Sequence, residues 1–320
     1  MRADLPAAVK DLPWPSSNSP SPSHNGRDTV YGWLYRPTRP TRGVVQLIHG
    51  LGEHSRRYLH LITRLLDAGF AVVADDHSGH GKTAVESGFW VDTGDDGAET
   101  AVADEVALLA LAREVYPDLP YIVFGHSWGS MIARPLASRV EIDGLILCGI
   151  AAQMTGAESS LDRAALAAEP DQSGPADPRY VDALFDGFVS RYADGAGPTA
   201  WVARSEDVVR DHGADPLNNF GAPMSVRFLR GFVDLYHQAN ADGWYTSVRQ
   251  DLPVLILAGD QDPVANYGEG AYHVANRLVA SGQVDVRARV YTGFRHEVHN
   301  EPEIRDDVEK EIVTFAEKVS

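Results

Sequence analysis

Three side chains that lie far apart in the sequence, a serine, an aspartate and a histidine, have the types needed for nucleophilic catalysis. The serine, Ser127, lies in the pentapeptide GHSWG at 125–129, directly after the apolar run 121–124. A sharp turn from a strand into a helix would project the Ser127 hydroxyl out of a sheet, and the flanking glycines permit so crowded a turn. A helix that begins there also supplies free N–H groups for a developing oxyanion. The segment therefore predicts a nucleophilic serine.

A serine hydroxyl needs a base to take its proton, and the base needs an acid to orient it. The apolar run 254–258 leads into Asp260 and Asp262, and the run that ends at Tyr291 leads into His296. The carboxyl ends of parallel strands share one edge of a sheet, which would bring these side chains near the serine. We predict His296 as the base and Asp262 as the acid. Asp260 and His299 remain competitors because spacing alone does not exclude them.

An oxyanion that forms at the reacting carbonyl needs two backbone N–H donors. One is expected from Trp128, which follows the serine, and the other from the loop after an early strand. The segment HGLGEH at 49–54 follows the apolar run 45–48 and matches that loop, with Leu51 as its donor. Leu51 and Trp128 are therefore the predicted oxyanion donors.

The segment DDHSGHGKT at 75–83 is rich in His and Asp but lacks a diagnostic spacing for a metal or phosphate site. We interpret it as a hydrogen-bonded loop that supports the floor of the site. No metal and no cofactor is predicted.

Short apolar runs alternate with helical patterns along most of the chain, which predicts an α/β fold with a mostly parallel sheet between helices. The expected strands are 29–35, 44–48, 71–75, 121–124, 145–148, 254–258 and 286–291. The expected helices are 57–68, 99–115, 128–139, 268–281 and 304–318.

This alternation stops between residues 151 and 250, where no convincing strand is found and aromatic residues are frequent. So long a segment is not a plain loop in a compact domain. We interpret it as a helical cap inserted over the carboxyl ends of the strands. The expected organisation is an extended lead-in over 1–28, an α/β core over 29–150 and 251–320, and a cap over 151–250.

Composition excludes several classes of protein. The 28 Lys and Arg against 45 Asp and Glu give a net charge of −17, which disfavours binding to nucleic acid or to anionic lipid. The single cysteine, Cys148, excludes a disulfide framework and lies in an apolar run, where a buried side chain is expected. No apolar run is long enough to span a bilayer or resembles a signal peptide, so a cytoplasmic location without stable membrane insertion is expected.

The chain resembles α/β-hydrolases of the monoacylglycerol lipase and lysophospholipase-like group, also classed as serine aminopeptidase-type hydrolases. The matching segments are HGLGEHSRRY at 49–58, DHSGHGKT at 76–83, FGHSWGS at 124–130, LAGDQDPVAN at 257–266 and YTGFRHEVHNE at 291–301. The resemblance implies an α/β-hydrolase fold with an inserted cap, the triad Ser127–His296–Asp262, and oxyanion donors Leu51 and Trp128. The sequence departs from this group at Trp128, where methionine is common, and at Ser130, where glycine is usual. The bulky indole is expected to reshape the acyl pocket.

The resemblance implies a serine hydrolase that cleaves carboxylic esters through an acyl-enzyme. The apolar composition of the expected cap favours a moderately hydrophobic, uncharged small-molecule ester as its substrate. A thioesterase, lactonase or C–C bond hydrolase would use the same triad. A receptor-like binder that captures a small ligand under the cap without turnover is the non-catalytic alternative. Acyl length, the alcohol part and the oligomeric state are left open by the sequence.

Overall fold

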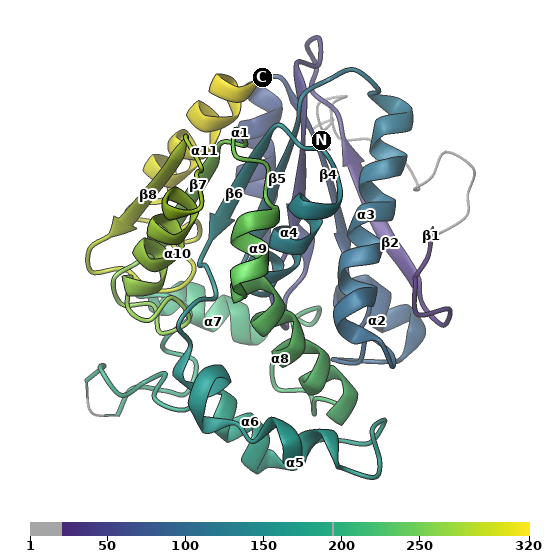
Figure 1. The fold of residues 1–320 in the computed structure, drawn as a ribbon, viewed down its shortest axis with the longest axis vertical. Helices are drawn as coiled ribbons and strands as arrows, with labels where there is room; N and C mark the ends of the chain where they lie inside the picture. The colour runs from purple at the N-terminus through teal and green to yellow at the C-terminus, as the bar shows by residue number, and fades with distance from the viewer. Residues whose placement is uncertain (1–20, 194) are drawn as a thin grey trace, which may run out of the picture.

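An eight-stranded sheet forms the centre of the protein, whose computed structural model describes residues 21–193 and 195–320 (Figure 1). The strand order is β1-β2-β4-β3-β5-β6-β7-β8. Strands β3 to β8 run parallel, whereas β2 pairs antiparallel with both β1 and β4. The strands are β1 (Ser21–Pro22), β2 (Thr29–Tyr35), β3 (Gly43–Ile48), β4 (Phe70–Asp76), β5 (Tyr121–His126), β6 (Gly144–Cys148), β7 (Val254–Gly259) and β8 (Val286–Tyr291).

Both faces of the central strands are covered, and for this reason their sequences are continuous apolar runs. Every residue of β3 to β7 is buried. Alternate residues of a strand point to opposite faces. Val45 of β3 pairs with Val72 and Ile122, and these three belong to a core shared with α1 (Leu59–Asp67) and α11 (Arg305–Val319). Val44 belongs instead to the core on the opposite face, which is shared with α3 (Gly97–Val115) and α4 (Trp128–Arg139).

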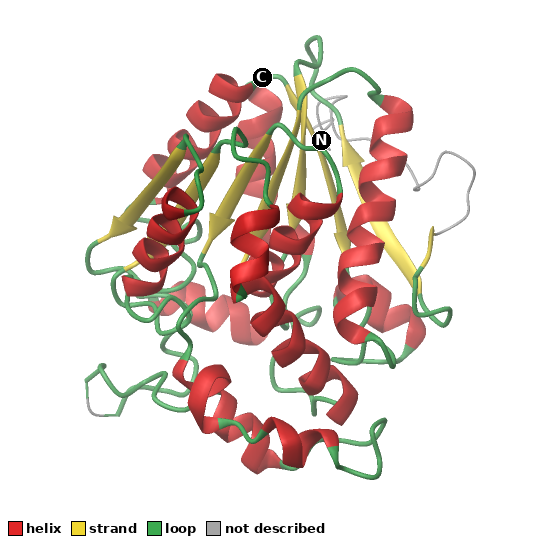
Figure 2. Cartoon of the chain, in the orientation of Figure 1, coloured by secondary structure: helices red, strands yellow, loops and turns green. Residues whose placement is uncertain are grey.

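The described part of the chain contains eleven α-helices. They are α1 (Leu59–Asp67), α2 (Gly81–Ser87), α3 (Gly97–Val115), α4 (Trp128–Arg139), α5 (Arg163–Ala167), α6 (Pro178–Leu184), α7 (Glu206–Ala214), α8 (Val226–Asn240), α9 (Asp242–Ser247), α10 (Glu269–Ala280) and α11 (Arg305–Val319). Figure 2 shows helices on both sides of the sheet and others beyond the carboxyl ends of its strands. The predicted α/β class and its mostly parallel sheet are confirmed. The sequence did not predict the short elements β1 and α2.

Helices α5 to α9 all lie between β6 and β7, within the segment expected to form a cap. Figure 1 places α5 and α6 beyond the carboxyl ends of the parallel strands. Helices α8 and α9 return along the molecule and pack against α4, and α8 also contacts α3. The only strand-like pairing in this segment, among its described residues, is an isolated bridge between Pro175 and Ser225.

A buried arginine in α4 joins this helical segment to the sheet domain. The guanidinium of Arg134 donates to the carbonyl of Ala151 at 2.7 Å and to the carbonyl of Ala239 at 3.2 Å. Trp244 of α9 donates its indole N–H to the Arg134 carbonyl at 2.6 Å. Burial lowers the pKa of Arg134 to about 10, and these carbonyls replace the water that its charge would otherwise bind.

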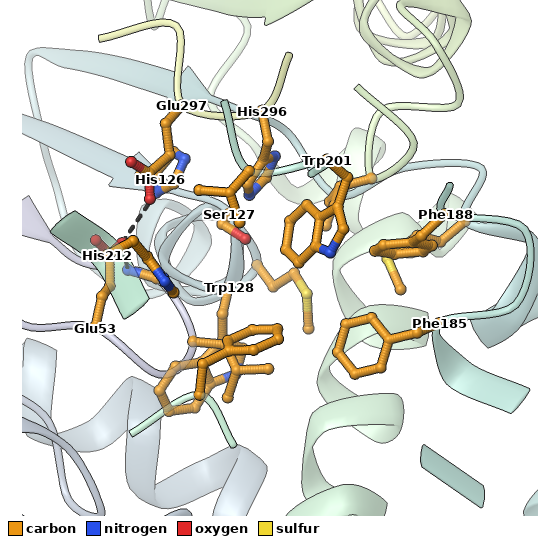
Figure 3. A pocket seen from close by; sticks show the side chains of 18 of the residues that line it. Glu53, His126, Ser127, Trp128, Phe185, Phe188, Trp201, His212, His296 and Glu297 are labelled. Carbon is orange, nitrogen blue, oxygen red and sulfur yellow. Dashed lines mark hydrogen bonds and ion pairs between the residues drawn. The ribbon is translucent and has the colours of Figure 1, made fainter. Parts of the chain in front are cut away.

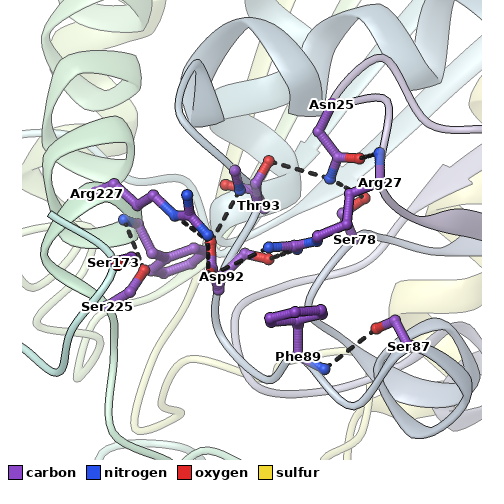
Figure 4. A network of polar contacts seen from close by, with 12 residues as sticks. Asn25, Arg27, Ser78, Ser87, Phe89, Asp92, Thr93, Ser173, Ser225 and Arg227 are labelled. Carbon is purple, nitrogen blue, oxygen red and sulfur yellow. Dashed lines mark hydrogen bonds and ion pairs between the residues drawn. The ribbon is translucent and has the colours of Figure 1, made fainter.

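A second connection is made by the buried side chain of Asp92 (Figure 4). Its carboxylate accepts hydrogen bonds from Arg227 of α8 at 2.8 and 2.6 Å. Arg27, from the turn that precedes β2, lies 3.3 Å from the same carboxylate and donates to the Asp92 carbonyl at 2.8 Å. Residues 23–28 thus form a hydrogen-bonded turn, whereas residues 1–20 of the predicted lead-in lie outside the described residues.

Among the described residues, no helix has the length and apolar character needed to cross a membrane.

Candidate active site

Ser127 occupies a strained turn between β5 and α4. Its φ of 54° and ψ of −118° lie in a region that residues with a side chain rarely adopt, at a cost of about 1–3 kcal/mol. The flanking glycines permit close packing of the turn. A Cβ atom on Gly125 would lie 2.4 Å from the Gly129 carbonyl oxygen, and one on Gly129 would lie 2.2 Å from the Ile48 carbonyl oxygen. The structure therefore contains the strand–turn–helix context in which the sequence placed this serine.

His296 and Asp262 lie together at the carboxyl ends of β8 and β7. The Nδ1 atom of His296 is 2.9 Å from Oδ2 of Asp262, and both side chains are buried. The other carboxylate oxygen of Asp262 accepts the backbone N–H of Val264 at 2.9 Å, which fixes the carboxylate. Burial lowers the pKa of His296, but the adjacent Asp262 charge more than offsets this, and the pKa is raised above 6.5.

The two competing residues occupy different positions. Asp260 accepts the backbone N–H of Gly293 at 2.7 Å and so fixes the loop that precedes His296. His299 is fully buried, stacks on Tyr58 with ring centroids 4.8 Å apart, and has its Nδ1 atom 3.7 Å from the sulfur of Cys148. Neither residue lines the cavity described next.

Ser127 and His296 line one apolar cavity (Figure 3). The Ser127 hydroxyl has no hydrogen-bond partner among the described residues, so it is not bonded to His296 in this conformation. Such contacts are often long in the absence of substrate. The apolar part of the lining consists of Leu51, Trp128, Met131, Ala151, Met154, Phe185, Phe188, Trp201, Val202, Phe220, Phe232 and Val264. The cavity is small, with a volume of about 30 Å³.

Leu51 and Trp128 border the same cavity. Leu51 lies in the loop that follows β3, and Trp128 is the first residue of α4. Neither backbone N–H has an acceptor among the residues that the structure describes. The indole of Trp128 is buried and stacks on His80, with ring centroids 4.9 Å apart. Ser130, at the second departure from the resemblance, donates its hydroxyl to the Ser127 carbonyl at 2.6 Å.

A buried cluster of charges beneath the cavity was not predicted. Arg57 binds both carboxylate oxygens of Glu297, at 2.6 and 2.8 Å, and lies 2.8 Å from Glu53. Burial raises the pKa of Glu297, but Arg57 more than compensates and lowers it to about 2. The only sequence signal was the position of these charged residues inside the segments HGLGEHSRRY and HEVHNE.

One group of side chains has a composition that could hold a metal ion. Ligand atoms of Asp75, His77 and Glu105 lie within 4.8 Å of one another, and all three side chains are buried. His77 belongs to the loop that was expected to support the floor of the site, and its ring contacts Trp128 edge-on.

Comparison with known proteins assigns the chain to a family. The model of the serine aminopeptidase S33 hydrolases matches residues 39–303. The chain belongs to this family. A monoacylglycerol lipase of Mycolicibacterium smegmatis is 32% identical over 291 residues, covering 88% of this chain and 91% of the relative.

Solved structures give the same result for the fold and the enzyme class. A lipase described in its open form has 52% identity and a TM-score of 0.91, covering 94% of this chain and 97% of its own. A thermostable carboxyl esterase from Bacillus coagulans, in complex with glycerol, has 44% identity and a TM-score of 0.90, with the same coverage. The predicted α/β-hydrolase fold and the predicted class of carboxylic ester hydrolase are confirmed.

Proposed function

We propose that the protein hydrolyses uncharged esters of fatty or short-chain acids through Ser127, His296 and Asp262. The contact between His296 and Asp262, at the wall of the cavity that Ser127 also lines, is the observation that carries this proposal. Asp262 holds the proton-bearing Nδ1 of His296, so that Nε2 is the basic atom available to the serine.

The reaction has two steps. His296 takes the proton of Ser127 as its oxygen attacks the ester carbonyl carbon, and the N–H groups of Leu51 and Trp128 donate to the oxyanion. His296 then gives the proton to the leaving alcohol, and the acyl group stays on Ser127. In the second step, His296 activates a water molecule that releases the carboxylic acid and restores the serine.

The lining of the cavity supports an apolar acyl group. Twelve of its lining side chains are aromatic or aliphatic, and the two carboxylates in the lining, Glu53 and Glu297, are already paired with Arg57. Names of relatives add a class of substrate: monoacylglycerols and simple carboxylic esters. We therefore propose monoesters with one acyl chain as substrates.

Access to this cavity requires a change in the cap segment. An outer cleft of about 580 Å³ lies on the cap and shares four aromatic side chains with the inner cavity. These shared residues are Phe185, Phe188, Trp201 and Phe220. Figure 3 shows three of them along one side of the pocket that contains Ser127. We propose that an acyl chain enters between these rings as they turn aside.

A pair of neighbouring aspartates provides the sharpest test of the triad. Asp262→Asn should reduce kcat for p-nitrophenyl butyrate by about 10⁴-fold, because the amide favours the wrong tautomer of His296. Asp260→Asn, at the end of the same strand, should keep kcat within about tenfold because it changes only a loop contact. A larger loss in Asp260→Asn than in Asp262→Asn would refute the assignment. Ser127→Ala should abolish turnover while the circular dichroism spectrum is unchanged.

A substrate panel tests the chemical class. Rates should be compared for p-nitrophenyl esters from C2 to C16, monoacylglycerols, thioesters and lactones. Highest kcat/KM on a thioester or a lactone would contradict the proposed class while leaving the triad intact. Ligand-induced stabilisation without product would favour the non-catalytic binder.

A further inference from the structure

In the loop after β3, side chains bind three of the four polar groups of two consecutive peptide units, those between His49 and Gly50 and between Gly50 and Leu51. The Gly50 N–H donates to Oε1 of Glu53 at 2.6 Å. The His49 carbonyl lies 3.2 Å from Nε2 of His77, and the Gly50 carbonyl lies 2.8 Å from Nδ1 of His49. The fourth polar group, the N–H of Leu51, has no acceptor within the described part of the chain.

The hydrogen-bond partners of the His49 ring show which of its two nitrogens carries the hydrogen. A carbonyl oxygen only accepts, so Nδ1 of His49 must carry the hydrogen that reaches the Gly50 carbonyl. The backbone N–H of His77 donates to Nε2 of His49 at 3.1 Å, so this second nitrogen carries none. His49 is therefore a neutral imidazole, consistent with the strong lowering of its pKa by burial and by His77.

This contact fixes the direction of the free N–H group. In a trans peptide unit the carbonyl and the N–H point in opposite directions. Because His49 holds the Gly50 carbonyl, the Leu51 N–H of the same unit points away from the His49 ring. A rotation of this peptide unit would break the hydrogen bond to His49 and turn the Leu51 donor away from its present direction.

His77 is in turn held from its other side. Its Nδ1 atom lies 3.1 Å from Asp75 and 3.1 Å from Glu105, and the His49 and His77 rings stack with centroids 3.8 Å apart. Gln46 of β3 donates to the Glu105 side chain. Since Nε2 of His77 must donate to a carbonyl, a hydrogen on Nδ1 as well makes this ring an imidazolium.

Burial and neighbouring charges shift the pKa values of two members of this buried group. Burial lowers the pKa of His77, but Asp75 and Glu105 more than offset this and raise it well above 6.5. Burial and the charge of Asp75 raise the pKa of Glu105 to about 8. The ring of His77 therefore lies against two carboxyl groups, which hold it in place from the side opposite His49.

We propose that His49 and His77 are positioning residues that fix the direction of the Leu51 N–H, with Asp75 and Glu105 anchoring the His77 ring. The inference rests on the proposed function, in which this N–H donates to the oxyanion. It adds four side chains that touch no substrate but determine the strength of transition-state binding.

The test compares two substitutions of His49 that differ in one donor. Asparagine places its amide N–H close to the position of Nδ1, whereas alanine offers no donor. His49→Ala should lower kcat for p-nitrophenyl butyrate about 10–100-fold with KM changed less than about twofold, since the oxyanion donor is misdirected rather than lost. His49→Asn should stay within about fivefold of the natural protein.

A transition-state analogue separates positioning from general damage. A trifluoromethyl ketone forms a tetrahedral adduct with Ser127, so its affinity should fall in His49→Ala by the same factor as kcat. Equal losses in the alanine and asparagine variants, or a loss of kcat without a loss of analogue affinity, would overturn the proposal. The Ser127→Ala variant separates failure of this inference from failure of the proposed function, because turnover that survives in Ser127→Ala refutes the proposed function itself.

A second comparison keeps the proposal testable if His49→Ala does not fold. His77→Gln retains an N–H close to the position of Nε2 and should keep kcat within about fivefold, while His77→Ala should show the selective loss of kcat and analogue affinity. One equivalent of tightly bound metal, lost together with activity on chelation, would overturn the anchoring of His77 by Asp75 and Glu105.

Discussion

Gly129→Ala tests whether close contact between α4 and β3 sets the geometry of the site. The added Cβ atom would lie 2.2 Å from the Ile48 carbonyl oxygen and 2.6 Å from the His49 carbonyl oxygen. Both neighbours are backbone atoms, and they cannot rotate away as a side chain would. The start of α4 and the end of β3 must therefore separate by at least about 0.8 Å to reach a 3.0 Å contact.

This separation affects both predicted oxyanion donors, because one lies at the start of α4 and the other follows β3. A misplacement of about 1 Å costs on the order of 10²-fold in rate. Overpacking of this kind destabilises by about 1–3 kcal/mol. We expect kcat for p-nitrophenyl butyrate to fall about 30–300-fold in Gly129→Ala, with a lowered Tm.

Gly243→Ala is the matched control. Gly243 lies exposed in α9, and a Cβ atom there would meet nothing within 4 Å. Alanine is the better helix former, so this variant should keep its kcat and be stabilised by up to about 1 kcal/mol. Steady-state kinetics and thermal unfolding of both variants give the comparison. If Gly129→Ala keeps kcat within threefold of the natural protein, the reasoning from this contact is wrong.

Three further outcomes follow from described contacts. The kcat/KM of the natural protein should fall as pH decreases through a value above 6.5, because a protonated His296 cannot accept the serine proton. In Asp262→Asn, which lacks the carboxylate charge that raises the pKa of His296, this fall in the pH–rate profile should occur at lower pH. Burial raises the pKa of Asp92, but Arg227 more than offsets this, and the pKa lies below 3.8. The stability that this ion pair contributes is therefore present above pH 3.8 and is lost as the pH falls further. Asp92→Asn should therefore destabilise by about 1–3 kcal/mol in urea at pH 7 and by less at pH 3; equal losses would contradict the ion pair. Phe185→Ala should raise kcat/KM for C12 relative to C4 esters, and an unchanged ratio would argue against entry between the cap aromatics.

The sequence was sufficient to predict those elements that a local pattern of residues specifies. Strands β3 to β7 were predictable because burial on both faces requires continuous apolar runs. The order of serine, aspartate and histidine, each after an apolar run, placed Ser127 and His296 at one edge of the sheet. Spacing alone did not separate Asp260 from Asp262, and the family resemblance favoured Asp262. In the structure Asp262 contacts His296, whereas Asp260 accepts the Gly293 N–H.

Other features depend on contacts between distant segments. Arg57 and Glu297 are separated by 240 positions, and no periodicity relates two such residues. Helix α2 has only seven residues and begins with glycine, so its sequence gives little helical preference. Its formation depends on tertiary contacts, among them the backbone N–H of Tyr31 in β2, which donates to the Thr83 hydroxyl at 3.1 Å.

The burial of Cys148 has a practical consequence for measurements in solution. It is the single cysteine of the 320-residue chain, and its side chain is fully enclosed beneath His299. Burial raises the pKa of its thiol, so the reactive thiolate is scarce at neutral pH. A maleimide dye or a nitroxide would therefore react selectively with a cysteine introduced at the exposed position Val189, between α6 and α7. Fluorescence or electron paramagnetic resonance could then test the proposed movement of the segment over the cavity that Ser127 lines, without first removing a native thiol.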